Sequence, residues 1–173
     1  MNDERIWHGI RRALDDSDPG PCRPRDRRAD QVSEKMKPVR KDSNQMNYTI
    51  DKIFPGADIE DIDARTRAAL AAAGFGVLTE IDVKATMKKK IDKNLPGYRI
   101  LGACNPNMAW QAIGMEPKVG AMLPCNVIVR ETAEGVEVSA VDPVISMTGI
   151  NNQELGEVAG QVRKMLQEVV SAI

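Results

Sequence analysis

The clearest hydrophobic pattern of the chain lies at its C-terminal end. Apolar side chains recur there three or four positions apart, which is the spacing of one face of an α-helix. This stripe consists of Leu155, Val158, Ala159, Val162, Met165, Leu166, Val169 and Val170. Asn151 and Glu154 have the spacing of a capping box and predict where the helix begins. Gly156 and Gly160, four positions apart, are expected to allow close packing on a sheet or a second subunit.

A second helical stripe follows residue 58. It consists of Ile59, Ile62, Thr66, Ala69, Leu70 and Ala73. Asp58 is a suitable N-cap for this helix, and Gly74 is a suitable C-terminal stop. Shorter helices are expected over residues 84–93 and after Asn105, which can cap a helix that has Pro106 at its first position.

Five segments have the alternating or continuous apolar pattern of β-strands. They are residues 47–54, 76–83, 98–104, 122–130 and 136–141, of which the last two are expected to form a hairpin. In residues 76–83, simple alternation predicts Val77, Thr79, Ile81 and Val83 on one face and Leu78, Glu80 and Asp82 on the other.

The order of these elements predicts an α+β fold. We expect two layers, with a mainly antiparallel sheet of about five strands and two main helices on one face of it. The order is β-α-β4-α, with short inserted helices, and the single α+β domain spans residues 46–173.

Residues 1–45 differ from the domain in composition. Their segment from 15 to 28 is dense in charge and proline and contains almost nothing to bury, so we expect a disordered tail. Because a clean strand pattern begins at Met46, an alternative is that the start of translation has been assigned too far upstream.

Composition and charge limit the function. Hydrophobic residues make up 42% of the chain, which allows a real core, but aromatic residues make up only 3%. Residues 1–45 hold 11 Lys+Arg and 9 Asp+Glu, whereas residues 46–173 hold 13 and 16, a net charge of −3. Nucleic-acid binding needs clustered positive charge, so nucleic acid is an unlikely partner of this acidic domain.

The chain contains neither a long apolar run nor the apolar centre of a secretory signal, so we expect a cytoplasmic protein with no membrane partner. Its cysteines are therefore expected to be thiols. The one histidine, His8, precedes the domain. Catalytic triads that need histidine, and most zinc and haem sites, are thereby excluded from residues 46–173, and we predict no metal site.

Four motifs in the right order resemble the family called domain of unknown function 302. They are Gly74–Lys84 (GFGVLTEIDVK), Tyr98–Pro106 (YRILGACNP), Leu123–Val127 (LPCNV) and Ser139–Pro143 (SAVDP). The resemblance covers about residues 46–173. It implies a fold similar to the α+β arrangement of the TATA-binding protein and a homodimer, but it implies no established activity.

Two cysteine–asparagine pairs form the primary candidate site. Cys104-Asn105 ends one predicted strand and Cys125-Asn126 begins the next. Because Cys104 directly precedes a predicted helix, the helix dipole is expected to favour its thiolate. If the two strands are neighbours, the sulfur atoms can approach each other.

These pairs allow four functional interpretations. They can form a small-ligand pocket, a thiol redox or nucleophilic site, or a soft-metal site helped by Met108 or Met122. In the fourth interpretation the cysteines are buried structural side chains and the asparagines cap the backbone. Our main hypothesis is a homodimeric small-ligand-binding protein, with a thiol-dependent enzyme or redox protein, or a structural partner protein, as alternatives. The sequence identifies no cofactor.

A secondary candidate site consists of Glu80, Asp82 and Lys84. The two carboxyl groups are two residues apart on one strand and can act as acid and base if one is desolvated. Such carboxylates are more often solvated or paired, here with Lys84 or Arg99. Lys88, Lys89 and Lys90 can contact a phosphate or an acidic partner, but a solvated helix face is the simpler interpretation.

Overall fold

The structure is a computed structural model of the 173-residue chain and describes residues 47–173. The predictions for residues 1–45, including the disordered tail and the alternative start, lie outside the described residues.

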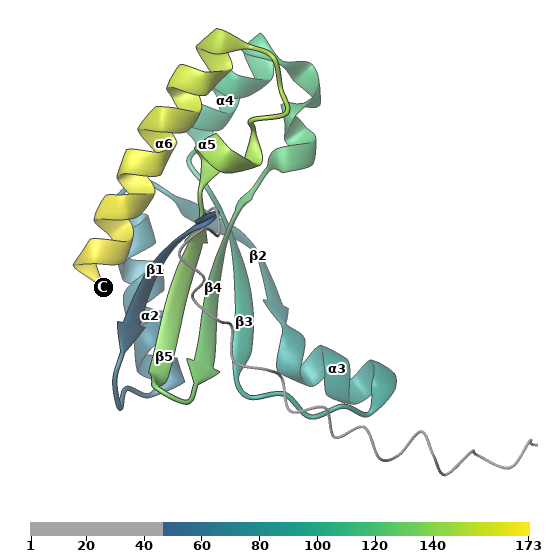
Figure 1. Cartoon of the computed structure of the whole chain (residues 1–173), viewed down its shortest axis with the longest axis vertical. Coiled ribbons are helices and arrows are strands. Elements are labelled where there is room, and N and C mark those ends of the chain that lie inside the picture. Colours follow the sequence, from purple (N-terminus) through teal and green to yellow (C-terminus); the bar gives the residue numbers. More distant parts are fainter. Residues whose placement is uncertain (1–46) are drawn as a thin grey trace, which may run out of the picture. The chain divides into compact units, whose positions relative to one another are not determined.

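A five-stranded antiparallel sheet forms the centre of the domain (Figure 1). Its strands are β1 (Thr49–Phe54), β2 (Gly76–Asp82), β3 (Tyr98–Cys104), β4 (Cys125–Thr132) and β5 (Gly135–Val141). The spatial order is β1-β5-β4-β3-β2, and all four pairings are antiparallel. The predicted hairpin of the last two strands is confirmed, and the first strand pairs with the fifth along an edge.

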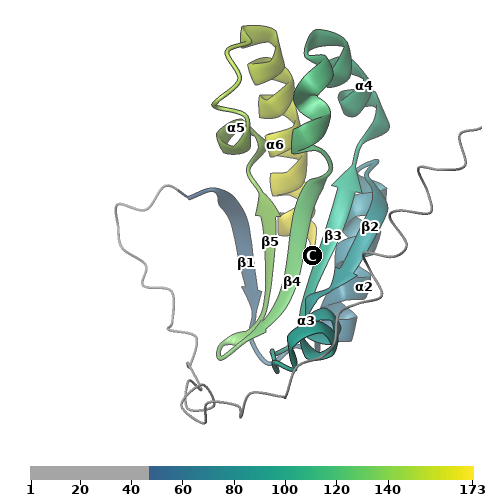
Figure 2. The same cartoon turned by 90° about the vertical axis from the view of Figure 1, so that its right-hand side faces the viewer.

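Two main helices, α2 (Ile59–Ala72) and α6 (Gln153–Ala172), lie on one face of this sheet (Figures 1 and 2). The α+β prediction is therefore confirmed. Asp58 caps α2, because its carboxylate accepts hydrogen bonds from the backbone N–H groups of Glu60 and Asp61. Gly74 follows α2 with a φ of 78°, a conformation that glycine adopts without strain. The cap of α6 is Asn152, one residue later than the predicted Asn151.

The main core fills the space between the sheet and these two helices. Its fully buried side chains include Ile62, Leu70, Leu101, Val127, Val129, Val138, Leu166 and Val169. The exposed side of α6 carries polar residues, so the predicted apolar stripe marks the buried face of the helix correctly.

A second core lies beyond the end of the sheet, where α6 continues past the strands (Figure 2). There α6 packs on α4 (Pro106–Met115) and on α5 (Pro143–Ser146), and the 3₁₀ segment η2 (Pro117–Met122) packs on α4. Its buried side chains are Ala112, Val119, Met147, Leu155, Val158 and Ala159. The sequence predicted a strand from residue 122, but η2 occupies that position and β4 begins at Cys125. Glu116 caps η2 and Pro117 begins it, which favours a helical turn there.

The sheet has a second face that α2 and α6 do not cover. In register across β2, β3 and β4 it carries Ile81, Ile100 and Ile128. The simple alternation predicted for β2 is wrong, because the register shifts between Val77 and Thr79. Leu78 is the extra residue and is 66% exposed. Val77 therefore shares the core face with Glu80, whereas Thr79 and Ile81 share the open face.

Helix α3 (Val83–Ile91) connects β2 to β3 and projects from one end of the sheet (Figure 1). None of its residues is fully buried. Among the helices that the structure describes, none has both the length and the apolar composition needed to cross a membrane.

Candidate functional site

The junction between β3 and α4 positions the first cysteine–asparagine pair. Cys104 is the last residue of β3, and the side chain of Asn105 caps α4 as predicted. The Asn105 Oδ1 atom accepts hydrogen bonds from the backbone N–H groups of Asn107 and Met108, at 3.1 and 3.2 Å. Asn105 therefore satisfies two of the free N–H groups at the start of α4.

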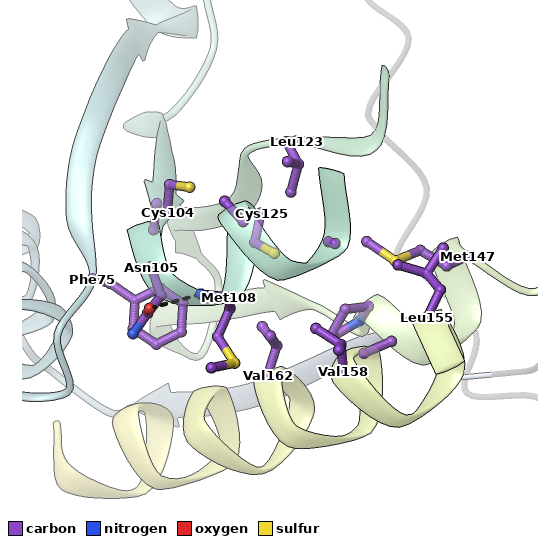
Figure 3. Close-up of a pocket in the computed structure, with 15 residues that line it drawn as sticks. Phe75, Cys104, Asn105, Met108, Leu123, Cys125, Met147, Leu155, Val158 and Val162 are labelled. Atoms are coloured by element: carbon purple, nitrogen blue, oxygen red, sulfur yellow. Dashed lines mark hydrogen bonds between the residues drawn. The ribbon is translucent and has the colours of Figure 1, made fainter. Parts of the chain in front are cut away.

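Cys104 and Cys125 line one small cavity, which we call the inner cavity (Figure 3). The two cysteines lie on adjacent strands, where Ala103 pairs with Cys125. Other lining residues are Phe75, Met108, Ala112, Met147, Leu155, Val158, Ala159 and Val162. The cavity has a volume of about 30 Å³, which is room for roughly two water-sized groups. The amide of Asn105 is used as a helix cap, so the inner cavity has an apolar character.

The environment of the two thiols favours their protonated forms. Burial raises the pKa of the Cys104 thiol above its ordinary value. Burial, and to a smaller extent the neighbouring Cys104, raises the pKa of Cys125 to about 11. The expectation of a stabilised Cys104 thiolate is therefore not met, because desolvation dominates and Asn105 caps the helix. At neutral pH both thiols are weak nucleophiles.

Asn126 does not join the other three residues of the predicted site. It is exposed and pairs with Gly102 on β3, whereas Cys125 is 6% exposed and packs in the main core. Successive side chains of a strand point to opposite faces, so Cys125 and Asn126 cannot serve one pocket. The structure thus brings together Cys104, Asn105 and Cys125.

The secondary candidates lie at the other end of β2. Glu80 is paired with Arg67 of α2, with Oε2 and Nη2 2.7 Å apart, instead of with Lys84 or Arg99. Asp82 caps α3 through a 2.8 Å hydrogen bond from the backbone N–H of Ala85. Lys84 is exposed. Glu80 therefore fastens α2 to the sheet and Asp82 caps α3, whereas Lys84 forms no hydrogen bond or ion pair with either of them.

A network of ion pairs surrounds the buried Asp63, which the sequence did not single out. Asp63 Oδ2 lies 2.8 Å from Arg67 Nε and 3.4 Å from Arg99 Nη1. Arg99 also forms an ion pair with Glu60. The hydrogen bond that Arg67 donates to Asp63 raises the pKa of Arg67, and the hydrogen bond that Glu60 accepts from Arg99 lowers the pKa of Glu60. The network joins α2 to β2 and β3 and supports a structural role.

A larger cavity, which we call the outer cavity, lies beside the inner one. It has a volume of about 180 Å³ and is lined by Val144, Met147, Thr148, Ile150, Asn152, Leu155, Gly156 and Ala159. Thr148 and Gly156 are exposed, so the cavity reaches the surface between the α5 segment and α6. The sequence predicted a packing role for Gly156. It gave no signal for Met147, because the segment from 143 to 152 carries no periodic pattern.

Gly156 and Gly160 are not needed for close packing within residues 47–173. A Cβ atom added at either glycine would meet no other atom within 4 Å. At Gly156 this open space belongs to the outer cavity, whereas Gly160 borders neither cavity. Within residues 47–173, no group of three or more His, Cys, Asp and Glu side chains is placed to hold a metal ion.

Comparison with known proteins identifies the family. The model of the family described as domain of unknown function DUF302 matches residues 52–173. The chain belongs to the DUF302 family. No curated protein matches it.

The crystal structure of an uncharacterised conserved DUF302 protein from Bacillus stearothermophilus has a similar fold. The two structures have a TM-score of 0.69 at 22% sequence identity, over 73% of this chain and 98% of that one. At this identity the similarity supports the DUF302 fold alone. The five-stranded antiparallel sheet with its helices is thus the family arrangement, and the resemblance stated from the four sequence motifs is confirmed.

Proposed function

We propose that this DUF302 domain binds a small apolar molecule in the outer cavity, beside the thiol-lined inner cavity. The observation that carries the proposal is the size and lining of the outer cavity, about 180 Å³ among mainly apolar side chains. An enclosed cavity of about 150 Å³ lined by Leu, Ile and Phe can bind benzene, and the outer cavity offers a similar volume at the surface. The inner cavity alone, at about 30 Å³, is too small for such a ligand.

The position of the outer cavity also supports a binding role. It lies in the second core, away from the sheet, where the packing of α5 and α6 leaves unfilled space. Unfilled apolar space lowers stability, since the lining atoms lose packing contacts. A bound apolar molecule would restore those contacts and bury further apolar surface.

The raised pKa values of Cys104 and Cys125 fit an apolar binding site better than the thiol-dependent alternative. A redox or nucleophilic cysteine generally has a lowered pKa, near a cation or a helix N-terminus. Here a protonated thiol behaves as a small apolar group that can border a hydrocarbon.

Binding of 1-hexanol to matched glycine variants tests the proposal. Gly156→Leu should fill the outer cavity and abolish the binding seen by calorimetry and by amide chemical-shift changes around Thr148. Gly160→Leu is the control, because it adds the same side chain to the same helix at a site that borders neither cavity. The proposal is rejected if the parent protein does not bind 1-hexanol, or if the two variants bind it equally well.

The homodimer remains a prediction that follows from the family resemblance. We propose to test it by sedimentation equilibrium of the full chain. A mass of about 38 kDa, twice the 19.0 kDa of one chain, would support a homodimer, and a mass that stays at one chain would contradict it.

A further inference from the structure

Three side chains form the wall between the two cavities. Met147, Leu155 and Ala159 line both the inner and the outer cavity. Figure 3 shows Met147 beside Leu155 at one end of the inner cavity, with Cys104 and Cys125 on the strands beyond. Truncating Met147 or Leu155, or rotating either side chain, would therefore join the cavities into a single channel.

Met147 is the side chain of this wall that can move most easily. Leu155 and Ala159 belong to the regular helix α6, where Leu155 is branched and Ala159 has no rotamers. The backbone of Met147 is fixed by a 3.1 Å hydrogen bond from its N–H to Pro143 and by a 2.9 Å bond from the N–H of Ile150 to its carbonyl oxygen. Its unbranched thioether chain has three rotatable bonds and adapts to irregular space.

The two ends of the joined channel differ in polarity. At the outer rim, Thr148 is exposed and Asn152 is half-buried. Their oxygen atoms already have partners, since Thr148 Oγ1 donates to Ile145 O at 2.8 Å and Asn152 Oδ1 accepts from Leu155 N at 3.1 Å. The head group of a ligand there would meet water. The inner end is closed by Phe75 and Cys125, which are buried and uncharged at neutral pH.

We infer that the ligand is an unbranched aliphatic molecule with a polar head, and that Met147 limits the length of its chain. The head remains at the exposed rim near Thr148, and the tail fills the outer cavity up to Met147. The narrow inner cavity beyond Met147 accepts only the end of a longer chain. This inference rests on the proposed function. It adds the chemical class of the ligand and the residue that limits the length of the ligand chain.

A series of straight-chain alcohols from 1-butanol to 1-decanol tests this inference. In the parent protein, affinity should rise about fourfold with each methylene until the tail reaches Met147, and should then level off. In Met147→Ala the rise should continue for about three further carbons, because the mutation removes the Cγ, Sδ and Cε atoms. Met147→Val should extend the rise by fewer carbons, and it provides a second test if the alanine variant does not fold.

Met165→Ala is the matched control. It removes the same three atoms from a half-buried methionine of α6 that packs on the main core and borders neither cavity. In this control, affinity should stop rising at the same alcohol chain length as in the parent. If the parent and both Met147 variants level off at the same length, the role of Met147 is refuted while the proposed function stands. If no alcohol binds the parent, the proposed function fails, and this inference fails with it.

Discussion

Arg163 of α6 holds its Nε atom 3.0 Å from the Oδ2 atom of Asp142, a residue that is 1% exposed. The N–H direction does not satisfy hydrogen-bond geometry, so the contact is an ion pair. The other oxygen of Asp142 caps α5 by accepting from the N–H groups of Val144 and Ile145. The Asp142 carboxylate thus fixes the start of α5 and also holds α5 against α6. It thereby positions the segment that borders the outer cavity.

Breaking this pair from its two sides should have unequal effects. Arg163→Met leaves a buried carboxylate without its cation and should lower the free energy of unfolding by about 2 kcal/mol. This loss is smaller than for a fully buried pair, because Arg163 is partly exposed and solvent screens the interaction. Asp142→Asn keeps an oxygen for the cap and leaves an arginine that water can reach, so about 1 kcal/mol is expected. Urea unfolding measures both, and a larger loss for Asp142→Asn would contradict this account.

The contribution of Arg67 to stability should depend on the shape of its guanidinium group as well as on its charge. It contacts Asp63 through Nε at 2.8 Å and Glu80 through Nη2 at 2.7 Å. Arg67→Lys keeps the charge but cannot reach both carboxylates, so a loss of about 1 kcal/mol is expected, against about 2 kcal/mol for Arg67→Met.

The exposed pair of Lys88 and Asp92 provides the comparison for Arg67. Its atoms are 2.6 Å apart, closer than either Arg67 contact, yet both side chains are largely exposed. Lys88→Met should leave the urea midpoint almost unchanged, because solvent screens the pair. If Arg67→Met and Lys88→Met lowered the urea midpoint equally, burial would not decide how strongly these ion pairs stabilise the protein.

Gly102 should tolerate no side chain, although it lies on the open face of the sheet. A Cβ atom there would be 2.1 Å from Thr79 Oγ1 and 2.7 Å from Pro124 Cγ. Gly102→Ala should therefore destabilise the protein by about 2 kcal/mol. Gly114→Ala, in α4 with nothing within 4 Å of the added atom, should instead stabilise it by about 0.5–1 kcal/mol. Thermal unfolding of both variants tests the pair, and a stable Gly102→Ala would contradict the packing.

The two domain thiols should alkylate slowly at neutral pH. Cys125 is the more buried of the two, and its pKa of about 11 leaves very little thiolate at pH 8. In a Cys22→Ser background, iodoacetamide should label Cys104 before Cys125, and unfolding in urea should accelerate both. Rapid labelling of native Cys104 at pH 7 would instead revive the thiol-dependent alternative.

Stability should fall in alkaline solution because of Cys125. Its folded pKa of about 11 lies above the value of about 8.5 in an unfolded chain, so the folded state holds the proton more tightly. This contribution is complete below about pH 8.5 and is lost as the pH rises to about 11, amounting to roughly 3 kcal/mol. The difference in unfolding free energy between the parent and Cys125→Ala should shrink over this range, and a constant difference would contradict it.

Much of the local structure was predictable because it depends on neighbouring residues. The apolar stripes of α2 and α6 and the caps at Asp58 and Asn105 follow from side chains a few positions apart. The family motifs were also present in the sequence itself. By contrast, the bulge at Leu78 and the start of β4 after η2 depend on pairing and packing with distant segments, and there the sequence predictions were wrong.

By itself, the sequence determined the class of fold, the limits of most elements and the presence of two cysteine–asparagine pairs. Only the tertiary structure decided that Asn126 lies on the open face and that Met147 lines two cavities. The physical reason is that helical periodicity and caps arise from contacts within one or two turns. Strand order, cavities and ion pairs such as Asp142–Arg163 arise instead where segments far apart in the chain compete to bury the same surface.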